Sequence, residues 1–230
     1  MKLFLDTANF KEIEEINGWG VLDGVTTNPT LLAKEANGQQ DAPPGAPKKD
    51  YKQMLKEICA EVEGAVSAEV VSTETESMLS EARDLAQIAE NIYVKFPCIP
   101  AGLAATKAAR AEGIRVNMTL VFSPAQTLLA AKAGANFISP FLGRIDDVAS
   151  GGMDILAQCI EVVKNYDFPS EVLASSLRHP MHVVEAARLE SDIATMPFDV
   201  FTKLVKHPLT DIGLKRFIDD WNNAREALGA

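Results

Sequence analysis

The sequence predicts an α/β protein built as a single (β/α)8 barrel of the TIM type, with an additional C-terminal helix. Eight short strand-like runs alternate with helix-like stretches along the chain, and no shift in composition divides the 230 residues into two parts. No GxGxxG follows a strand and no Walker A motif is present, which disfavours an open sheet with a nucleotide site. An open, doubly wound α/β sheet remains the alternative.

The candidate strands are short, several are rich in Val and Ile, and Gly, Pro, Asn or Asp bounds them, as is typical of buried parallel strands. The eight runs are residues 2–5, 24–27, 66–71, 92–96, 114–120, 136–141, 171–175 and 192–195.

The segments between these runs carry a helical period. Residues 51–62 place apolar side chains on one stripe, and the other helix-like segments are 78–89, 103–111, 125–133, 153–163 and 183–189. Gly113 and Gly134 follow two of these segments where a C-terminal cap is expected.

Two segments fall outside the repeat. Residues 38–50, dense in Gly and Pro, are expected to form an exposed insertion with neither helix nor strand. The tail from Leu209 has an apolar stripe typical of an amphipathic helix, which needs an apolar surface to dock on. With these additions, we expect residues 1–230 to form one domain.

The composition is that of a soluble globular protein, with 47% hydrophobic and 23% charged residues. A formal net charge of -10 argues against a nucleic-acid partner, because Lys and Arg surfaces bind phosphate backbones. The three cysteines are far apart and form no CxxC pair, as expected in a reducing cytosol. No apolar run is long enough for a signal peptide or a membrane span, so we expect a cytoplasmic protein with no membrane partner.

Polar residues interrupt or follow the predicted strands, where barrels carry their functional groups. Lys95 is the most informative, because a lysine within IYVKF lies in an apolar environment that favours the uncharged amine, the nucleophile that forms Schiff bases. Asp6 and Glu69 are candidates for proton transfer beside it. We expect the amine to face these two acids across a water-sized gap.

Each of these residues also has a simpler interpretation. Lys95 could protect an edge strand, Asp6 could cap the helix that follows it, and Glu69 could face solvent. Asn28 could be only a turn residue before Pro29.

Basic residues follow the late predicted strands. Arg144, and Ser176 with Arg178, lie where barrels often bind anions, although a lone arginine more commonly pairs with a surface carboxylate. His179 and His182 form HxxH, but no third ligand lies nearby in the sequence, which disfavours a zinc site.

Six segments, taken together and in order, closely resemble the small transaldolase subfamily and its relative fructose-6-phosphate aldolase. They are FLDTANFKEIEEI, GVTTNPTLL, YVKFPCIPAGLAATK, EGIRVNMTLVFSPAQ, SPFLGRIDD and VLASSLR, and the resemblance covers nearly the whole chain. It implies a Schiff-base mechanism on a (β/α)8 barrel, with no metal and no organic cofactor.

The resemblance also assigns roles. It implies that Lys95 forms the Schiff base, that Asp6 is the acid/base, and that Glu69 and Thr119 hold a catalytic water. It implies further that Asn28 and Asn117 bind sugar hydroxyls and that Arg144, Ser176 and Arg178 bind phosphate. Arginine at 178 is a mild departure, because some members have lysine there.

Two positions separate the relatives. The aldolases carry glutamine and tyrosine where this chain has Glu69 and Phe141, so the chain resembles a transaldolase. Phe141 has no hydroxyl to protonate an enamine, which would keep the enamine until an acceptor aldehyde arrives. The alternatives are an aldolase that releases free dihydroxyacetone, and a sugar-phosphate-binding barrel without turnover.

The expected partners are small-molecule sugar phosphates and further copies of the chain. The resemblance implies a homo-oligomer, a pentamer or decamer, in which the C-terminal helix reaches a neighbour. The same apolar stripe could instead close the base of its own barrel.

Overall fold

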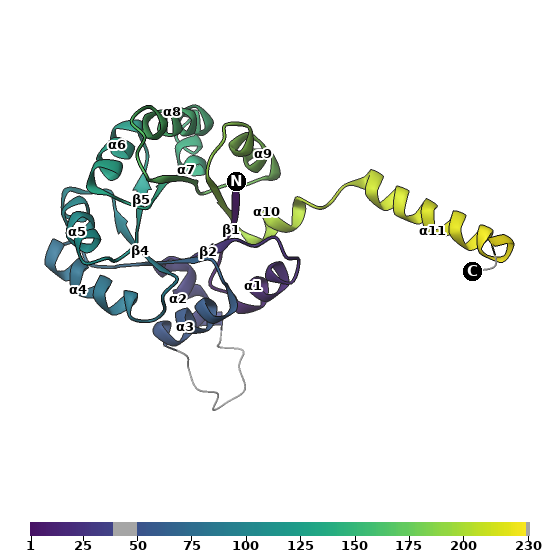
Figure 1. The fold of residues 1–230 in the computed structure, drawn as a ribbon, viewed down its shortest axis with the longest axis horizontal. Coiled ribbons are helices and arrows are strands. Elements are labelled where there is room, and N and C mark those ends of the chain that lie inside the picture. Colours follow the sequence, from purple (N-terminus) through teal and green to yellow (C-terminus); the bar gives the residue numbers. More distant parts are fainter. Residues whose placement is uncertain (39–49, 229–230) are drawn as a thin grey trace.

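Eight parallel strands close into a barrel in the computed structural model, which describes residues 1–38 and 50–228 (Figure 1). The strands are β1 (Lys2–Asp6), β2 (Gly24–Thr26), β3 (Ala65–Glu69), β4 (Ile92–Pro97), β5 (Val116–Val121), β6 (Phe137–Pro140), β7 (Glu171–Ala174) and β8 (Ile193–Met196). Each strand pairs with the next along the chain, and β1 also pairs with β8, so no strand lies at an edge. The predicted (β/α)8 barrel is confirmed, and the open sheet is wrong.

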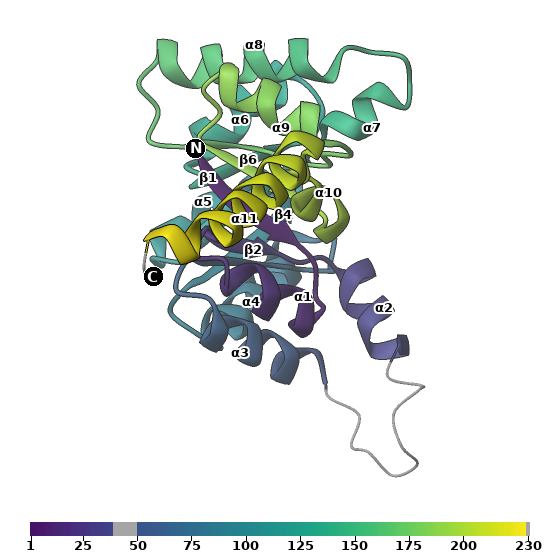
Figure 2. The same cartoon turned by 90° about the vertical axis from the view of Figure 1, so that its right-hand side faces the viewer.

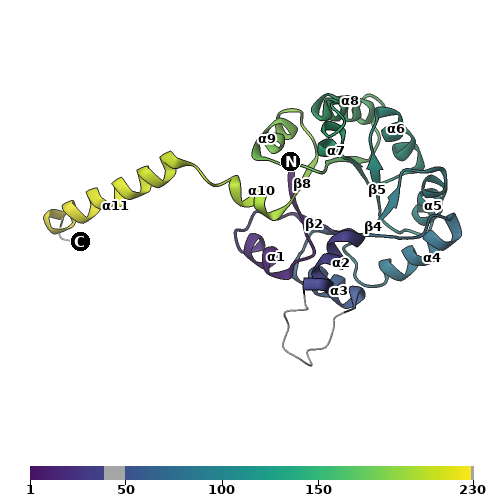
Figure 3. The same cartoon turned by 180° about the vertical axis from the view of Figure 1, so that it is seen from behind.

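Helices surround the barrel (Figure 3). They are α1 (Phe10–Asn17), α2 (Pro29–Gly38), α3 (Tyr51–Glu61), α4 (Thr75–Ala86), α5 (Pro100–Ala111), α6 (Pro124–Ala133), α7 (Leu142–Asp146), α8 (Gly152–Asn165), α9 (Pro180–Arg188), α10 (Phe198–Lys203) and α11 (Pro208–Leu228). The outward-facing residues of the strands pack on these helices in one large apolar core.

Local sequence explains where several helices begin and end. Proline stands in the first turn of α5, α6 and α9, where its missing N–H costs no hydrogen bond. Gly134 ends α6 with φ of 90°, and Gly113 follows the end of α5 with φ of 82°, both in the left-handed region that glycine adopts freely. The prediction that these two glycines follow helix ends is confirmed.

The interior of the barrel has two layers, because alternate residues of a strand point to the same side. The lower layer is apolar and aromatic: Phe137 stacks on Tyr93 with ring centroids 4.3 Å apart, and Phe4 meets it edge-on at 6.0 Å. Two residues further along each strand the side chains are polar. This upper layer contains Asp6, Thr26, Ser67, Lys95, Asn117, Ser139, Ser175 and Thr195.

Several predicted boundaries were wrong. The third strand ends at Glu69 and not at residue 71, and α2, α7 and α10 were not predicted as helices. Within the expected insertion 38–50, Gly38 is the last residue of α2, and Asp50 caps α3 by accepting the N–H of Gln53. Residues 39–49 lie outside the described part of the chain.

The C-terminal helix α11 extends away from the barrel (Figures 1 and 3), and in the view of Figure 2 it stands in front of the barrel. Its apolar side chains are exposed: Phe217 is 72% exposed and Trp221 is 52% exposed. The alternative in which this helix closes the base of its own barrel is therefore wrong. Among the described residues, no helix has the length and apolarity needed to cross a membrane.

Candidate active site

A polar cavity of about 180 Å³ opens at the carboxyl ends of the strands. Lys95, Asn117 and Arg144 contribute to its wall, and so do residues that the sequence analysis did not select. The full lining is Asp6, Thr26, Asn28, Lys95, Asn117, Ser139, Phe141, Arg144, Leu173, Ser175, Ser176 and Thr195. Seven of the ten predicted site residues therefore meet in one cavity.

Lys95 lies on β4 inside the barrel and is only 4% exposed. Its Nζ is 3.0 Å from Oε2 of Glu69 and donates a hydrogen bond of 3.1 Å to the carbonyl of Thr27. The edge-strand interpretation of Lys95 is therefore wrong, and so is solvent exposure of Glu69. The expected water-sized gap to Glu69 is also wrong, because β3 and β4 place Glu69 and Lys95 directly opposite each other.

Asp6 ends β1, and its carboxylate faces the same cavity. Thr26, its partner on β2, donates a hydrogen bond of 2.7 Å to Oδ1 of Asp6, and the Thr26 hydroxyl also lies 2.7 Å from that of Thr195. Burial raises the pKa of Asp6, while the charge of Lys95 and the hydrogen bond from Thr26 oppose the rise. A raised pKa lies closer to neutral pH than that of an ordinary carboxyl, which suits a group that must take and give a proton.

Asp6 is not a helix cap. The cap of α1 is Asn9, whose side chain accepts the N–H groups of Lys11 and Glu12. Asn28, in contrast, does what its simpler interpretation proposed: its Oδ1 accepts the N–H of Leu31 in the first turn of α2. Asn28 also lines the cavity, so its role in the turn does not exclude the predicted role in substrate binding.

Hydrogen bonds fix the orientation of the Asn117 amide. Ser139 donates to Oδ1 of Asn117 at 2.6 Å, and Nδ2 of Asn117 donates to Ser67 at 3.1 Å. Thr119, two residues along β5, is fully buried, and its hydroxyl has no hydrogen-bond partner among the described residues. That hydroxyl is available to bind a water molecule or a substrate group.

Phe141 and Leu173 are the apolar residues of the wall. The ring of Phe141 meets that of Phe122 edge-on, with centroids 5.8 Å apart. Position 141 therefore presents a hydrocarbon surface to the cavity.

Two of the three residues predicted to bind an anion line the cavity. Arg144, in α7, and Ser176 line the cavity, but Arg178 is absent from its wall. Both Nη atoms of Arg178 bind the carboxylate of Asp147 at 2.5 Å, which is the surface pairing that the sequence left open for this arginine. The hydrogen bonds from Arg178 hold the pKa of Asp147 below its usual range, and the charges of Arg178 and Arg144 act in the same direction.

The two histidines after β7 pack together, with ring centroids 3.7 Å apart. Burial lowers the pKa of His182, whose Nε2 lies 3.5 Å from Asp146. Across residues 1–38 and 50–228, no three His, Cys, Asp or Glu side chains are placed to hold one metal ion.

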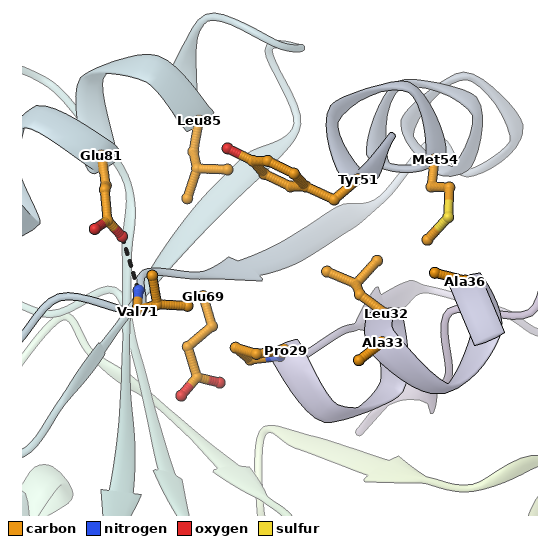
Figure 4. A pocket seen from close by; sticks show the side chains of 10 residues that line it. All are labelled: Pro29, Leu32, Ala33, Ala36, Tyr51, Met54, Glu69, Val71, Glu81 and Leu85. Carbon is orange, nitrogen blue, oxygen red and sulfur yellow. Dashed lines mark hydrogen bonds between the residues drawn. The ribbon is translucent and has the colours of Figure 1, made fainter. Parts of the chain in front are cut away.

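A larger cavity of about 460 Å³ lies between α2, α3 and α4, and its wall is mostly apolar (Figure 4). Leu32, Met54 and Leu85 contribute to it, and Glu69 lies at one side. The smaller cavity is the better candidate for chemistry, because it contains the lysine and most of the polar groups. Glu69 lines the larger cavity while its carboxylate contacts Lys95, so this side chain separates the two.

Sequence reasoning missed the hydroxyl side chains of the polar layer, including Thr26, Ser139 and Thr195. The sequence did contain a signal for them. Ser139 and Thr195 each lie two residues beyond an inward-facing residue of the apolar layer, and Thr26 lies opposite Asp6 on the neighbouring strand. Threonine also favours β-strands for steric reasons, which hides a functional hydroxyl among ordinary strand residues.

A buried lysine in contact with a carboxylate, set among hydroxyls and amides at the carboxyl ends of barrel strands, defines a barrel protein with a lysine-centred polar site. The model of the Transaldolase/Fructose-6-phosphate aldolase family matches residues 3–228, and the chain belongs to this family. It is an enzyme of the transaldolase family.

Proteins named probable transaldolase are similar over nearly their whole length. Those of Thermus thermophilus and Desulfatibacillum aliphaticivorans are 53% and 52% identical, each over 98% of this chain and 100% of theirs. That of Kosmotoga olearia is 50% identical over 100% of both chains. The solved structure of a thiamine phosphate pyrophosphorylase from Pyrococcus furiosus shares the fold, with a TM-score of 0.58 and 14% identity over 88% of this chain and 93% of that one.

Proposed function

We propose that this enzyme is a transaldolase of the pentose phosphate pathway. It transfers a dihydroxyacetone unit from sedoheptulose 7-phosphate or fructose 6-phosphate to glyceraldehyde 3-phosphate or erythrose 4-phosphate. The observation that carries the proposal is the contact between the buried amine of Lys95 and the carboxylate of Glu69, at 3.0 Å inside the barrel. A lysine held there can form a Schiff base with a ketose, without a metal or an organic cofactor.

Lys95 must lose a proton before it attacks, and Glu69 is placed to accept that proton. The free amine adds to C2 of the ketose, and one proton of its nitrogen passes to the former carbonyl oxygen. Glu69 then gives its proton to the resulting hydroxyl, which leaves as water. Thr119, with its buried hydroxyl unpaired among the described residues, is suited to hold this water beside Glu69. The product of this step is the protonated Schiff base.

Asp6 acts on the carbon–carbon bond. As a carboxylate it takes the proton of the C4 hydroxyl, the bond between C3 and C4 breaks, and the bonding electrons move into the Schiff base to give an enamine. The enamine then attacks the acceptor aldehyde, and Asp6 returns the proton to the new hydroxyl. The raised pKa of Asp6 supports both roles, because a carboxyl that titrates closer to neutral pH can take and give a proton.

Other residues bind the substrate in this proposal. The amides of Asn28 and Asn117 hydrogen-bond the hydroxyls of the dihydroxyacetone unit, and Arg144, Ser176 and Arg178 bind the phosphate. Charged hydrogen bonds from arginine suit a phosphate, because the guanidinium offers two parallel donors.

Transfer is favoured over simple cleavage by the apolar wall at Phe141. No hydroxyl at this position can protonate the enamine, so the three-carbon unit stays on Lys95 until an aldehyde accepts it. An aldolase would release dihydroxyacetone from fructose 6-phosphate without an acceptor. A coupled assay for free dihydroxyacetone, run with and without erythrose 4-phosphate, distinguishes the two activities.

Reductive trapping tests the proposal directly. Fructose 6-phosphate with borohydride should leave a reduced three-carbon unit on Lys95, detected by peptide mass spectrometry. The Lys95→Ala variant should lose both the label and activity, while Lys107→Ala, which removes an exposed lysine of α5, should keep both. Turnover by Lys95→Ala, or a label elsewhere, would contradict the assignment.

We further propose that residues 1–230 form one domain, that the enzyme is cytoplasmic, and that it assembles into a homo-oligomer, a pentamer or decamer. The exposed apolar side chains of α11 support assembly, because a helix that does not pack on its own barrel can bury them on a neighbour. Light scattering of the full chain and of a chain ending at residue 207 tests this. Equal subunit numbers for both would refute a role of α11.

A further inference from the structure

The guanidinium of Arg178 binds a carboxylate of its own chain through both Nη atoms. Its two Nη atoms bind the two oxygens of Asp147, each at 2.5 Å, and the side chains are 46% and 41% exposed. This parallel pair of hydrogen bonds is the same arrangement by which arginine binds a phosphate. The donors that the proposed function gives to the substrate are therefore occupied in this structure.

Asp147 can leave this pairing without breaking another hydrogen bond. Its side chain has no other hydrogen bond or ion pair within the described ranges, and it begins an exposed loop, residues 147–151. The neighbouring Asp146 differs, because its Oδ1 accepts the N–H of Gly152 at 2.8 Å and its Oδ2 lies near His182. Of the two adjacent acids, Asp146 holds the backbone and Asp147 binds only Arg178.

The pairing lies beside the candidate phosphate residues. At Gly143, an added Cβ would stand 2.6 Å from Nε of Arg178 and 2.3 Å from the carbonyl oxygen of Ser176, so Arg178 lies directly against α7. Arg144, the next residue, lines the cavity together with Ser176. Asp147 thus neutralises one of the two arginines at the mouth of the site.

We propose that Asp147 is an internal counter-ion of Arg178 that the phosphate of the substrate displaces. Asp147 then sets the selectivity between phosphorylated and unphosphorylated ketoses, because only a phosphorylated substrate must break this ion pair to bind. The inference rests on the proposed function, in which Arg144, Ser176 and Arg178 bind phosphate.

Calorimetric titration with inorganic phosphate tests this exchange, the displacement of Asp147 from Arg178 by phosphate, without turnover. Removing the charge in Asp147→Asn should tighten phosphate binding by about two- to five-fold, since an exposed ion pair contributes modestly. The control is Glu112→Gln, which removes the charge from a comparable exposed bidentate pair with Arg83, at 2.6 and 2.8 Å. This control should bind phosphate as the wild type does.

A double-mutant cycle separates displacement from a general effect of charge. If phosphate displaces Asp147 from Arg178, then Asp147→Asn should have a much smaller effect in the Arg178→Ala background, where only the charge of Arg144 still acts on Asp147. Steady-state kinetics should show a lower KM for fructose 6-phosphate in Asp147→Asn, an unchanged kcat, and a higher selectivity for fructose 6-phosphate over fructose.

Two results overturn the exchange. One is phosphate binding by Asp147→Asn that is unchanged or weaker. The other is an equal increase in phosphate affinity, caused by Asp147→Asn, in the presence and absence of Arg178; this would be a long-range effect of charge. If neither Arg144→Ala nor Arg178→Ala weakens phosphate binding, the phosphate site of the proposed function is wrong. If both arginine variants weaken phosphate binding but Asp147→Asn does not strengthen it, only the displacement of Asp147 is wrong.

Discussion

The hydroxyl of Thr26 should control the pH at which Asp6 ionises. Thr26 donates a hydrogen bond of 2.7 Å to the carboxylate, and this bond opposes the rise in pKa that burial causes. The Thr26→Val variant keeps the shape of the side chain and removes the donor. A hydrogen bond to a charged group contributes about 1.5 to 3 kcal/mol, which corresponds to about one to two pKa units. The pKa of Asp6 should therefore rise further in this variant.

The direction of the effect on activity follows from the proposed role of Asp6 as a base. The carboxylate must be ionised to take the C4 proton, so kcat/KM falls as the pH drops through the pKa of Asp6. A higher pKa moves this acidic limb to higher pH, by about one to two units in Thr26→Val. Thr26→Ser, which restores a hydroxyl, should return the limb toward its wild-type position.

The assay is the pH dependence of kcat/KM for fructose 6-phosphate with erythrose 4-phosphate as acceptor. Thr106→Val is a matched control, because Thr106 is fully buried in α5 and its hydroxyl has no partner among the described residues. This control should leave the limb in place. An acidic limb that stays fixed in Thr26→Val, or moves to lower pH, would refute the reasoning.

Three further substitutions test the site and the barrel that supports it. Ser139→Ala leaves Oδ1 of buried Asn117 without its 2.6 Å donor, so urea denaturation should show a loss of about 1 to 3 kcal/mol and the KM for the ketose should rise. Gly143→Ala forces a Cβ to within 2.3 Å of the Ser176 carbonyl oxygen; overpacking should cost about 1 to 3 kcal/mol in urea denaturation and weaken phosphate binding in calorimetry. Asn91→Ala removes hydrogen bonds to the carbonyls of Cys59, Val62 and Gly64, which should lower the free energy of unfolding by about 1 to 3 kcal/mol while borohydride labelling of Lys95 continues.

The sequence predicted the barrel and most residues of the candidate site, because both follow from local patterns. Alternation of strands and helices sets the order of pairing, and a charged residue such as Lys95 or Glu69 is conspicuous in an apolar strand. Closure of the barrel then brings together residues that are far apart in the sequence. Lys95 and Asp6 meet in one cavity for this reason.

The remaining features depend on distances that no local pattern contains. The direct contact between Lys95 and Glu69 follows from the register of β3 against β4. The pairing of Arg178 with Asp147 joins residues 31 positions apart through the close approach at Gly143. The five residues of α7 and the six of α10 are too few to show a helical period.

The projecting helix α11 has a kinetic consequence. Its charged residues form ion pairs one turn apart, Lys215 with Asp219 at 2.7 Å and Arg216 with Asp220 at 3.6 Å, and such pairs stabilise a helix without help from other elements. A segment that is already ordered loses little conformational entropy when it meets another surface. In the proposed homo-oligomer, encounters between subunits would then be productive without a coupled folding step, and the speed of assembly would depend on protein concentration.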